Sequence, residues 1–217
     1  MYLGVDEAGK GPVLGPMVAA AVLADPADLP AGADDSKRIA PSRRESIDAA
    51  IRETDAVSVG VAFVEPAEID RPDTDMNTLT VRGQARAVRA ALADRAAGSD
   101  DRAGTLDEPV RVVADAGDPT PPAVDVSAAH GADEDDPVVG AASVVAKVAR
   151  DARMAAIDAE YPAYDGLGSG YPSDPATRDF LRAYAEDHGD VPDCARRSWA
   201  TCDDVLAAAE QSGLDEF

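Results

Sequence analysis

Two apolar segments separated by a Gly/Pro-rich turn open the chain and constrain its fold most. Residues 2–6 (YLGVD) precede the turn at 9–16 (GKGPVLGP), and residues 17–24 (MVAAAVLA) are apolar throughout. Short apolar runs bounded by glycine and proline are typical of buried strands. The N-terminal segment therefore predicts a pair of buried strands, and with it a sheet at the core of the domain.

Helical patterns gather later in the chain than strand patterns do. Alternation at 57–63 and the short apolar run at 110–114 predict two more strands. Helices are predicted at about 41–54, 76–97, 137–159, 175–187 and 202–211, and loops at 25–37, 98–108 and 116–136. We therefore expect an α/β fold in which helices flank a mixed central sheet, followed by a C-terminal helical region.

The chain carries a formal net charge of −22 over 217 residues, and its hydrophobic fraction of 45% is sufficient for a folded core. Such acidity alone argues against nucleic acid or anionic membranes as partners. However, only Lys10, Lys37 and Lys147 are lysines among 20 basic residues, and acids are spread over all segments. This pattern is typical of a halophilic protein in molar salt, where the Debye length falls to about 3 Å. The charge therefore reflects the solvent rather than the partner.

The sequence has few cysteines and no targeting pattern. Cys194 and Cys202 are too few for a disulfide framework and lie in no zinc-binding spacing. The chain starts directly with a strand pattern, without a basic segment followed by an apolar one. Its longest apolar run, Met17–Ala24, is much shorter than a membrane span. We expect a cytoplasmic protein that does not contact membranes.

Acidic residues lie at the C-terminal ends of two predicted strands. Asp6 ends the first strand, and Asp115 follows the apolar run at 110–114. Strand ends open onto the ligand crevice of an α/β sheet, so adjacent strands would bring these two carboxylates together. A divalent cation such as Mg²⁺ or Mn²⁺ would relieve their repulsion. The alternative is that they form turns or helix caps.

Glu7 and the lysines are further candidates for such a site. Glu7 would point to the opposite face from Asp6 in a regular strand, so it can join the site only if the strand ends there. The glycines that follow make such a break easy. Each lysine is a candidate phosphate partner in a chain with so few of them, although chance retention is the alternative.

Six segments together resemble the ribonuclease HII (type 2 ribonuclease H) family. The opening GVDEAGKGPVLGPMVAAAV, then DDSKRI and VVAD, which ends at Asp115, resemble its first three motifs. ADEDDPVVGAASVVAKVARD resembles the fourth motif, GSGYPSDPATRDFL the tyrosine-bearing motif and RRSW the C-terminal one. The matches are collinear and cover nearly the whole chain. The charge pattern makes the sequence similar to a haloarchaeal member.

The resemblance implies an RNase H-like fold and an endonuclease that uses two divalent cations, Mg²⁺ or Mn²⁺. It would hydrolyse the RNA strand of RNA·DNA hybrids and incise 5′ of single ribonucleotides in duplex DNA, leaving 3′-hydroxyl and 5′-phosphate ends. The resemblance also implies a monomer with a catalytic domain at 1–155 and a helical substrate-binding region at 156–217. Some relatives contact a sliding clamp through a C-terminal tail, which Gln211–Phe217 resembles weakly.

The same resemblance assigns roles to individual residues. The metal-binding and catalytic carboxylates would be Asp6, Glu7, Asp115 and Asp133. The substrate-binding residues would be Gly9, Lys10, Gly11, Lys37, Ser143, Lys147 and Tyr171. Within this set, the glycine turn at 9–11 would contact the 2′-hydroxyl and its phosphate, and Tyr171 would pack on the ribose. For Tyr171, Ser143 and Lys147 the alternative is ordinary packing or solvation.

Three departures from the family pattern bear on these assignments. Lys10 stands where the family usually has Arg, so a bidentate phosphate contact is lost. Gly131 stands where a Lys usually precedes the fourth motif. Asp133 also follows Asp115 more closely than expected for archaeal members, and Asp151 is the alternative fourth carboxylate.

Two other functions are compatible with the sequence. A different RNase H-like nuclease, such as ribonuclease HIII or a junction resolvase, would share the fold, although GKGPVLGP and GSGYPSDP favour ribonuclease HII. A non-catalytic acidic binding module would leave hybrids and ribonucleotide-containing duplexes uncut in the presence of Mg²⁺ or Mn²⁺.

Overall fold

The computed structural model describes most of the chain and divides it into two compact units. The described residues are 1–32, 40–97, 111–115, 125–129 and 132–214, with only the backbone described at 111–115, 125–129 and 212–214. Unit 1 contains Met1–Ala8, Met17–Phe63 and Met76–Arg150, and unit 2 contains Gly9–Pro16, Val64–Asp75 and Asp151–Phe217. Both units therefore combine segments that lie far apart in the sequence.

Unit 1 is built on a five-stranded sheet with the strand order β3-β2-β1-β4-β5. Its strands are β1 (Tyr2–Ala8), β2 (Met17–Ala24), β3 (Ser58–Val64), β4 (Arg111–Asp115) and β5 (Asp125–Ala129). β1 pairs antiparallel with β2 and parallel with β4, and β4 pairs parallel with β5. The mixed central sheet expected from the sequence is confirmed.

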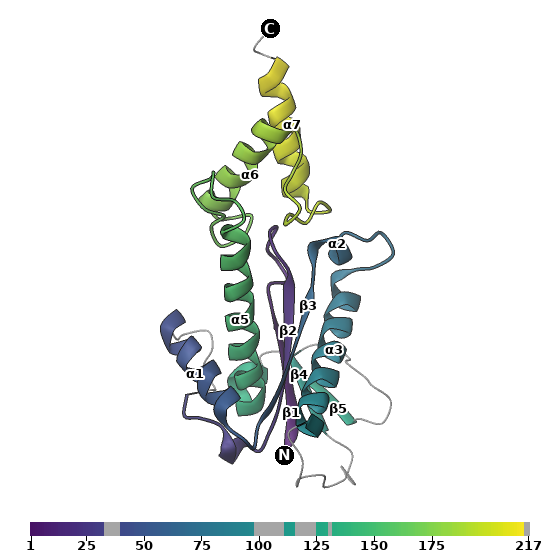
Figure 1. Cartoon of the computed structure of the whole chain (residues 1–217). Coiled ribbons are helices and arrows are strands. Elements are labelled where there is room, and N and C mark those ends of the chain that lie inside the picture. Colours follow the sequence, from purple (N-terminus) through teal and green to yellow (C-terminus); the bar gives the residue numbers. More distant parts are fainter. Residues whose placement is uncertain (33–39, 98–110, 116–124, 130–131, 215–217) are drawn as a thin grey trace. The chain divides into compact units, whose positions relative to one another are not determined.

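Helices cover both faces of this sheet (Figure 1). The helices of unit 1 are η1 (Pro26–Asp28, a 3-10 helix), α1 (Pro41–Glu53), α3 (Met76–Ala97), α4 (Ala132–Asp135) and the first part of α5 (Pro137–Asp158). α3 packs on the face that carries Leu3 and Val5, whereas α1 and α5 pack on the face that carries Ala20 and Val22. Because strand residues alternate between faces, β2 is buried from end to end.

Two glycines allow helices to approach this sheet closely. A Cβ added at Gly4 in β1 would collide with the backbone of Val138 in α5. A Cβ added at Gly60 in β3 would collide with the backbone of Ala87 in α3. Interiors are packed too densely to accept such atoms without rearrangement, so these two contacts require glycine.

Asp136 connects the start of α5 to β1. Its Oδ1 accepts hydrogen bonds from the backbone N–H of Val138 at 2.9 Å and of Val139 at 3.1 Å, and the Tyr2 hydroxyl donates to the same carboxylate at 2.9 Å. We expect Asp136→Ala to lower the free energy of unfolding by about 1–3 kcal/mol, because a helix cap and the acceptor of the Tyr2 hydroxyl are lost together. Urea unfolding measures this change. Tyr2→Phe, which removes only the hydroxyl, should cost less, and a wild-type stability for Asp136→Ala would contradict the expectation.

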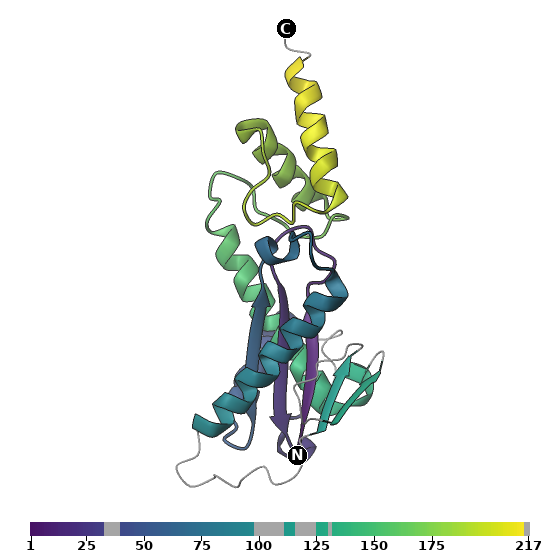
Figure 2. The same cartoon turned by 90° about the vertical axis from the view of Figure 1, so that its right-hand side faces the viewer.

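Unit 2 is helical. Its helices are α2 (Pro66–Ile69), the end of α5, α6 (Pro175–His188) and α7 (Ala200–Leu214), with α6 and α7 side by side (Figure 2). Phe180 of α6 and Val205 of α7 lie in one apolar core. Cys194 and Cys202 belong to the same core as free, buried thiols. The C-terminal helical region expected from the sequence is confirmed.

The long elements lie where the sequence predicts them, with ends that differ by up to three residues, and the elements that the prediction misses are short. β1 continues through Ala8 instead of ending at Asp6, and β5 lies in a segment predicted to be a loop. The short helices α2 and α4 have no counterpart in the prediction. Elements of four or five residues contain too few positions for a periodic pattern, so their tertiary contacts decide them.

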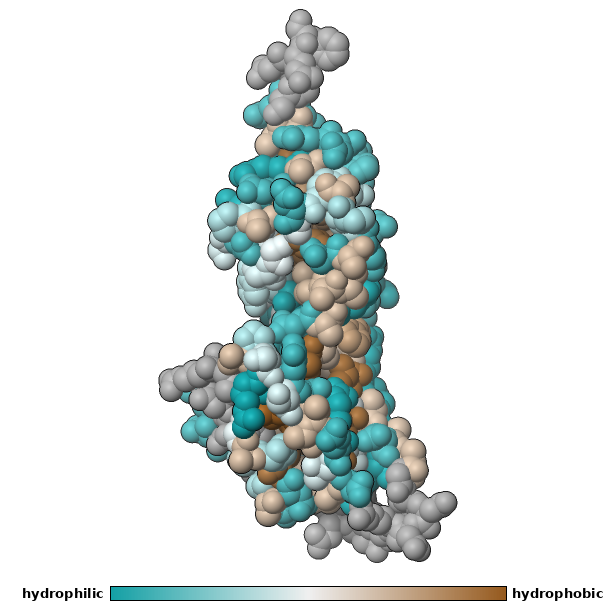
Figure 3. All heavy atoms as spheres, turned by 60° about the vertical axis from the view of Figure 1, so that its left-hand side comes forward, coloured by the Kyte–Doolittle hydropathy of each residue, from teal (hydrophilic) through white to brown (hydrophobic). Residues whose placement is uncertain are grey.

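Hydrophilic side chains are spread over the face drawn in Figure 3, with apolar ones among them. Across the described part of the chain, no helix is both long enough and apolar enough to span a membrane.

Candidate active site

β1 and β4 bring two of the expected metal ligands to the same end of the sheet. The last residues paired between these parallel strands are Val5 and Ala114. Asp6 and Asp115 come next on their strands, and β4 ends at Asp115. The two strands are adjacent, as a shared site requires, and the backbones of Asp6 and Asp115 are neighbours.

Asp6 is a buried carboxylate, with 5% of its surface exposed. Burial raises the pKa of Asp6 to about 7, and a hydrogen bond from the Ser143 hydroxyl opposes this shift. The negative charges of Glu7 and Asp133 raise the pKa of Asp6 further. The ionised form of Asp6 is therefore disfavoured in the protein alone, and a nearby cation would favour it.

Glu7 lies on the other face of the sheet from Asp6, because β1 continues as a strand through Ala8. Gln84 in α3 donates a hydrogen bond from its Nε2 to Oε2 of Glu7 at 2.6 Å. The strand end predicted at Asp6 is therefore wrong, and regular strand alternation determines where Glu7 points.

Gln84 is a residue of this site that sequence reasoning missed. It is fully buried, in the row of α3 that also buries Thr80, Ala87 and Val88. The sequence signal for this position is one amide side chain among small or apolar residues on the buried side of the predicted helix. Buried amides require polar partners, so such a position predicts a polar group on the facing strand.

Asp133 and Ser143 lie near Asp6 on the α5 face. Asp133, in α4, is 3% exposed and close enough to raise the pKa of Asp6. Ser143, expected to contact substrate, hydrogen-bonds Asp6, and Lys147 is half-buried one turn further along α5. The alternative carboxylate, Asp151, is exposed and belongs to unit 2. Asp133, and not Asp151, therefore shares unit 1 with Asp6.

The atoms around Asp6 that could bind a metal suit a hard divalent cation, because they are carboxylate oxygens with excess negative charge. Among the described residues, no three His, Cys, Asp or Glu side chains are gathered closely enough to hold an ion. The side chain of Asp115 lies outside the described part. Asp6 and Asp133 therefore fit as two ligands, and a complete set requires further residues.

In unit 2, residues 9–11 form the glycine turn assigned to substrate recognition. Gly9 has a φ of 86°, a backbone conformation that favours glycine, and Lys10 is exposed. The N–H of Val13 donates to the carbonyl of Gly170 at 2.8 Å. A Cβ added at Gly11 would lie 3.6 Å from Cε1 of Tyr171. The structure thus brings the glycine turn and Tyr171 together.

The loop that carries Tyr171 is fixed by internal hydrogen bonds. The N–H of Gly170 donates to Oγ1 of the buried Thr177 at 2.9 Å, and the Thr177 hydroxyl donates to the carbonyl of Leu167 at 2.8 Å. Tyr171 is 42% exposed beside this anchor, so the residue is accessible to a ligand. Two positions singled out in the sequence, Lys37 and Gly131, fall outside the described residues.

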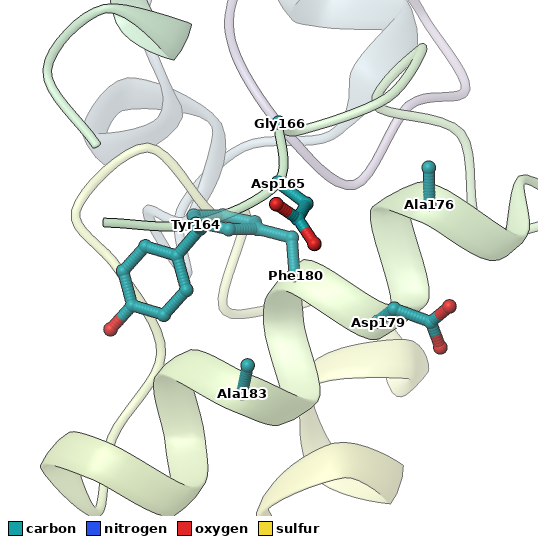
Figure 4. Close-up of a pocket in the computed structure, with 7 residues that line it drawn as sticks. All are labelled: Tyr164, Asp165, Gly166, Ala176, Asp179, Phe180 and Ala183. Atoms are coloured by element: carbon teal, nitrogen blue, oxygen red, sulfur yellow. The ribbon is translucent and has the colours of Figure 1, made fainter. Parts of the chain in front are cut away.

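A pocket of about 290 Å³ lies elsewhere in unit 2 (Figure 4). It is lined by Tyr164, Asp165, Gly166, Ala176, Asp179, Phe180 and Ala183. None of the residues expected to bind metal or substrate lines it, so it does not contribute to the candidate site.

Comparison with known proteins decides the family. The family model for ribonuclease HII matches residues 3–202. The chain belongs to the ribonuclease HII family. It is therefore a ribonuclease H enzyme, and the binding-module alternative is wrong.

Individual members of this family are similar over almost their whole length. A ribonuclease HII of Haloarcula marismortui is 58% identical over 217 residues, which cover 100% of both chains. The ribonuclease H2 of Pyrococcus horikoshii has a crystal structure with a TM-score of 0.78 and 30% identity, covering 97% of this chain and 99% of that one. The RNase HII of Archaeoglobus fulgidus, solved in complex with PCNA, gives a TM-score of 0.75 and 30% identity over 94% and 96% of the chains. The RNase H-like fold is confirmed.

Proposed function

We propose that this chain hydrolyses the RNA strand of RNA·DNA hybrids and incises duplex DNA 5′ of single ribonucleotides, leaving 3′-hydroxyl and 5′-phosphate ends. Membership of the ribonuclease HII family supports this substrate class. The observation that carries the proposal is Asp6, a buried carboxylate at a sheet end whose charged form is disfavoured by burial and by Glu7 and Asp133. Such a group suits a cation that is shared between protein and phosphate.

The proposed catalytic and metal-binding residues are Asp6, Glu7, Asp115 and Asp133. Two divalent cations, Mg²⁺ or Mn²⁺, would when bound lower the pKa of the attacking water and stabilise charge on the leaving 3′-oxygen. The chain's own contribution is orientation, because Ser143 hydrogen-bonds Asp6 and Gln84 hydrogen-bonds Glu7. In this structure Glu7 contacts Gln84 of α3 on the face opposite Asp6, so metal binding by Glu7 would require that contact to break.

The glycine turn at 9–11 and Tyr171 are proposed to recognise the ribonucleotide together. The 2′-hydroxyl distinguishes RNA from DNA, so a backbone turn and an aromatic ring that approach the ribose are suitable readers. Within unit 2, the carbonyl of Gly170, the residue before Tyr171, accepts a hydrogen bond from the N–H of Val13 and so connects the two elements. Lys10, Lys37, Ser143 and Lys147 are the remaining proposed substrate contacts.

The protein is proposed to be a monomer in which residues 1–155 form the catalytic domain and residues 156–217 bind the substrate. The glycine turn belongs to unit 2 together with 151–217, which supports a substrate-binding role for that unit. The Archaeoglobus fulgidus relative was solved with PCNA, which supports a sliding-clamp contact here. The candidate segment, Gln211–Phe217, extends beyond the described residues.

A cleavage assay tests the proposal. The purified protein with Mg²⁺ or Mn²⁺ should cut a hybrid and a duplex with one embedded ribonucleotide, and it should leave an all-DNA duplex of the same sequence intact. Cleavage should persist in molar KCl, because the net charge of −22 indicates adaptation to salt. If both ribonucleotide-containing substrates stay intact at every salt concentration, the proposed function is wrong. Loss of cleavage in molar KCl alone would overturn the salt adaptation only.

A further inference from the structure

Arg196 is the largest fully buried side chain described in the protein. Its guanidinium donates three hydrogen bonds to backbone carbonyls of one turn, from Nη2 to Gly9 at 2.6 Å, from Nη1 to Lys10 at 2.8 Å and from Nε to Gly15 at 2.9 Å. A buried charge is costly unless it is hydrogen-bonded in this way. All of these residues belong to unit 2, so the arginine and the turn form one substructure.

The main chain around Arg196 holds the other end of the same turn. The N–H of Arg196 donates to the carbonyl of Val13 at 2.8 Å, and the N–H of Gly15 donates to the carbonyl of Cys194 at 2.8 Å. The turn at 9–15 is therefore attached to the Arg196 segment along its whole length.

Trp199 completes this support. The guanidinium carbon of Arg196 lies 5.1 Å from the centre of the Trp199 ring, within the range of a cation–π contact. The indole N–H of Trp199 donates to the carbonyl of Gly11 at 3.4 Å. The carbonyls of Gly9, Lys10 and Gly11 thus all accept hydrogen bonds from the side chain of Arg196 or Trp199.

Holding these carbonyls fixes where the amides of the turn point. The structure contains no cis peptide bond in its described part, and in a trans peptide the C=O of one residue points opposite to the N–H of the next. The carbonyls of Gly9 and Lys10 point at the guanidinium, so the N–H groups of Lys10 and Gly11 point away from it. The carbonyl of Gly11 precedes Pro12, which has no N–H.

We propose that Arg196 is a positioning residue for substrate recognition: it sets the conformation of the glycine turn so that the amides of Lys10 and Gly11 face the ribonucleotide. This inference rests on the proposed function of the turn. Arg is suited to the task because its rigid fork supplies five donors, whereas Lys offers one compact ammonium. The buried charge also polarises the peptides that it contacts, which strengthens their N–H groups as donors.

The test is single-turnover cleavage of a duplex with one ribonucleotide by Arg196→Lys and Trp199→Phe. Arg196→Lys should lower the rate constant on the order of a hundredfold, because small misplacement of a substrate-positioning group has effects of this size. Trp199→Phe removes one weak hydrogen bond and keeps the aromatic ring, so a fall of about fivefold is expected.

The rate constant and the reaction amplitude separate positioning from folding. A variant that is partly unfolded loses amplitude and keeps the wild-type rate constant, whereas a displaced turn lowers the rate constant at full amplitude. Amide NMR signals of residues 9–11 should also shift in both variants. The matched control is Arg197→Lys, because Arg197 is exposed and pairs with Asp190 at 2.7 Å instead of with the turn. It should cleave as the wild type does.

The outcomes distinguish this inference from the proposed function. If the wild type cuts the duplex and both variants match its rate constant within twofold, Arg196 does not position the turn. If Arg196→Lys does not fold, Trp199→Phe becomes the test of the inference. A wild-type rate constant and unshifted amide signals in Trp199→Phe would then overturn it. If the wild type itself leaves the ribonucleotide duplex intact, the proposed function fails instead.

Discussion

Asp6→Asn should lower the cleavage rate by about 10³-fold or more while making the metal-free protein more stable at pH 8. Activity should fall because the proposed function makes Asp6 a carboxylate ligand of a cation, and a bound cation contributes several kcal/mol to transition-state stabilisation. Stability rises because the amide carries no charge that burial disfavours. The two effects have opposite signs, which separates a functional carboxylate from a structural one.

The pH dependence follows from the direction of the shift. The pKa of Asp6 is raised from 3.8 to about 7, so the folded protein keeps a proton that the unfolded chain has lost between these values. The free energy of unfolding therefore falls as the pH rises from about 4 to about 7, and it stays lower above that range. Asp6→Asn should be more stable than the wild type by about 2–4 kcal/mol at pH 8, and the difference should vanish near pH 4.

Thermal unfolding in EDTA at both pH values measures this difference. The matched control is Asp28→Asn, which removes an exposed carboxylate in η1 of the same unit and should change neither stability nor cleavage. A destabilised Asp6→Asn protein at pH 8 would show that the Asp6 charge is already compensated by the chain alone. Full activity of Asp6→Asn would exclude Asp6 from the catalytic site.

Gly4→Ala should destabilise the protein by more than about 3 kcal/mol. The added methyl would overlap the backbone of Val138 and the N–H of Val139 at the start of α5. Backbone atoms cannot rotate aside as a side chain can, so α5 must move away from β1. Because Asp136 fastens the same end of α5 to Tyr2, such a displacement also strains these hydrogen bonds.

Urea unfolding compares Gly4→Ala with Gly11→Ala, the same substitution in unit 2. The methyl at Gly11 would meet Cε1 of Tyr171 at an ordinary contact distance of 3.6 Å, so Gly11→Ala should stay within about 0.5 kcal/mol of the wild type. Wild-type stability of Gly4→Ala would show that α5 does not approach β1 as closely as the structure has it.

Sequence patterns were sufficient for the elements that are long and periodic. β2 at Met17–Ala24 and α3 at Met76–Ala97 have the predicted bounds, because an unbroken apolar run and a long helical pattern are local signals. The two acids at strand ends would meet only if their strands were adjacent, and the structure pairs β1 with β4 in parallel. The family was also recognisable from the sequence, because six segments that resemble its motifs occur in order along the chain.

Contacts between segments far apart in the sequence could not be predicted from local sequence patterns. The sequence places Glu7 beside Asp6, but strand alternation turns it toward Gln84, a partner 77 positions away. Arg196 is one of two consecutive arginines, and nothing local distinguishes it from Arg197, which is exposed. Which arginine enters the core depends on the path of the turn at 9–15, and that path is a property of the folded unit.

The sequence by itself determined four of the strands, the order of the long helices, the family and the candidate carboxylates, because these depend on local periodicity and on residue identity. The tertiary structure alone decided that burial raises the pKa of Asp6, that Gln84 holds Glu7 and that Arg196 supports the glycine turn. The physical reason is that burial and hydrogen-bond partners arise only when segments far apart in the chain are packed together.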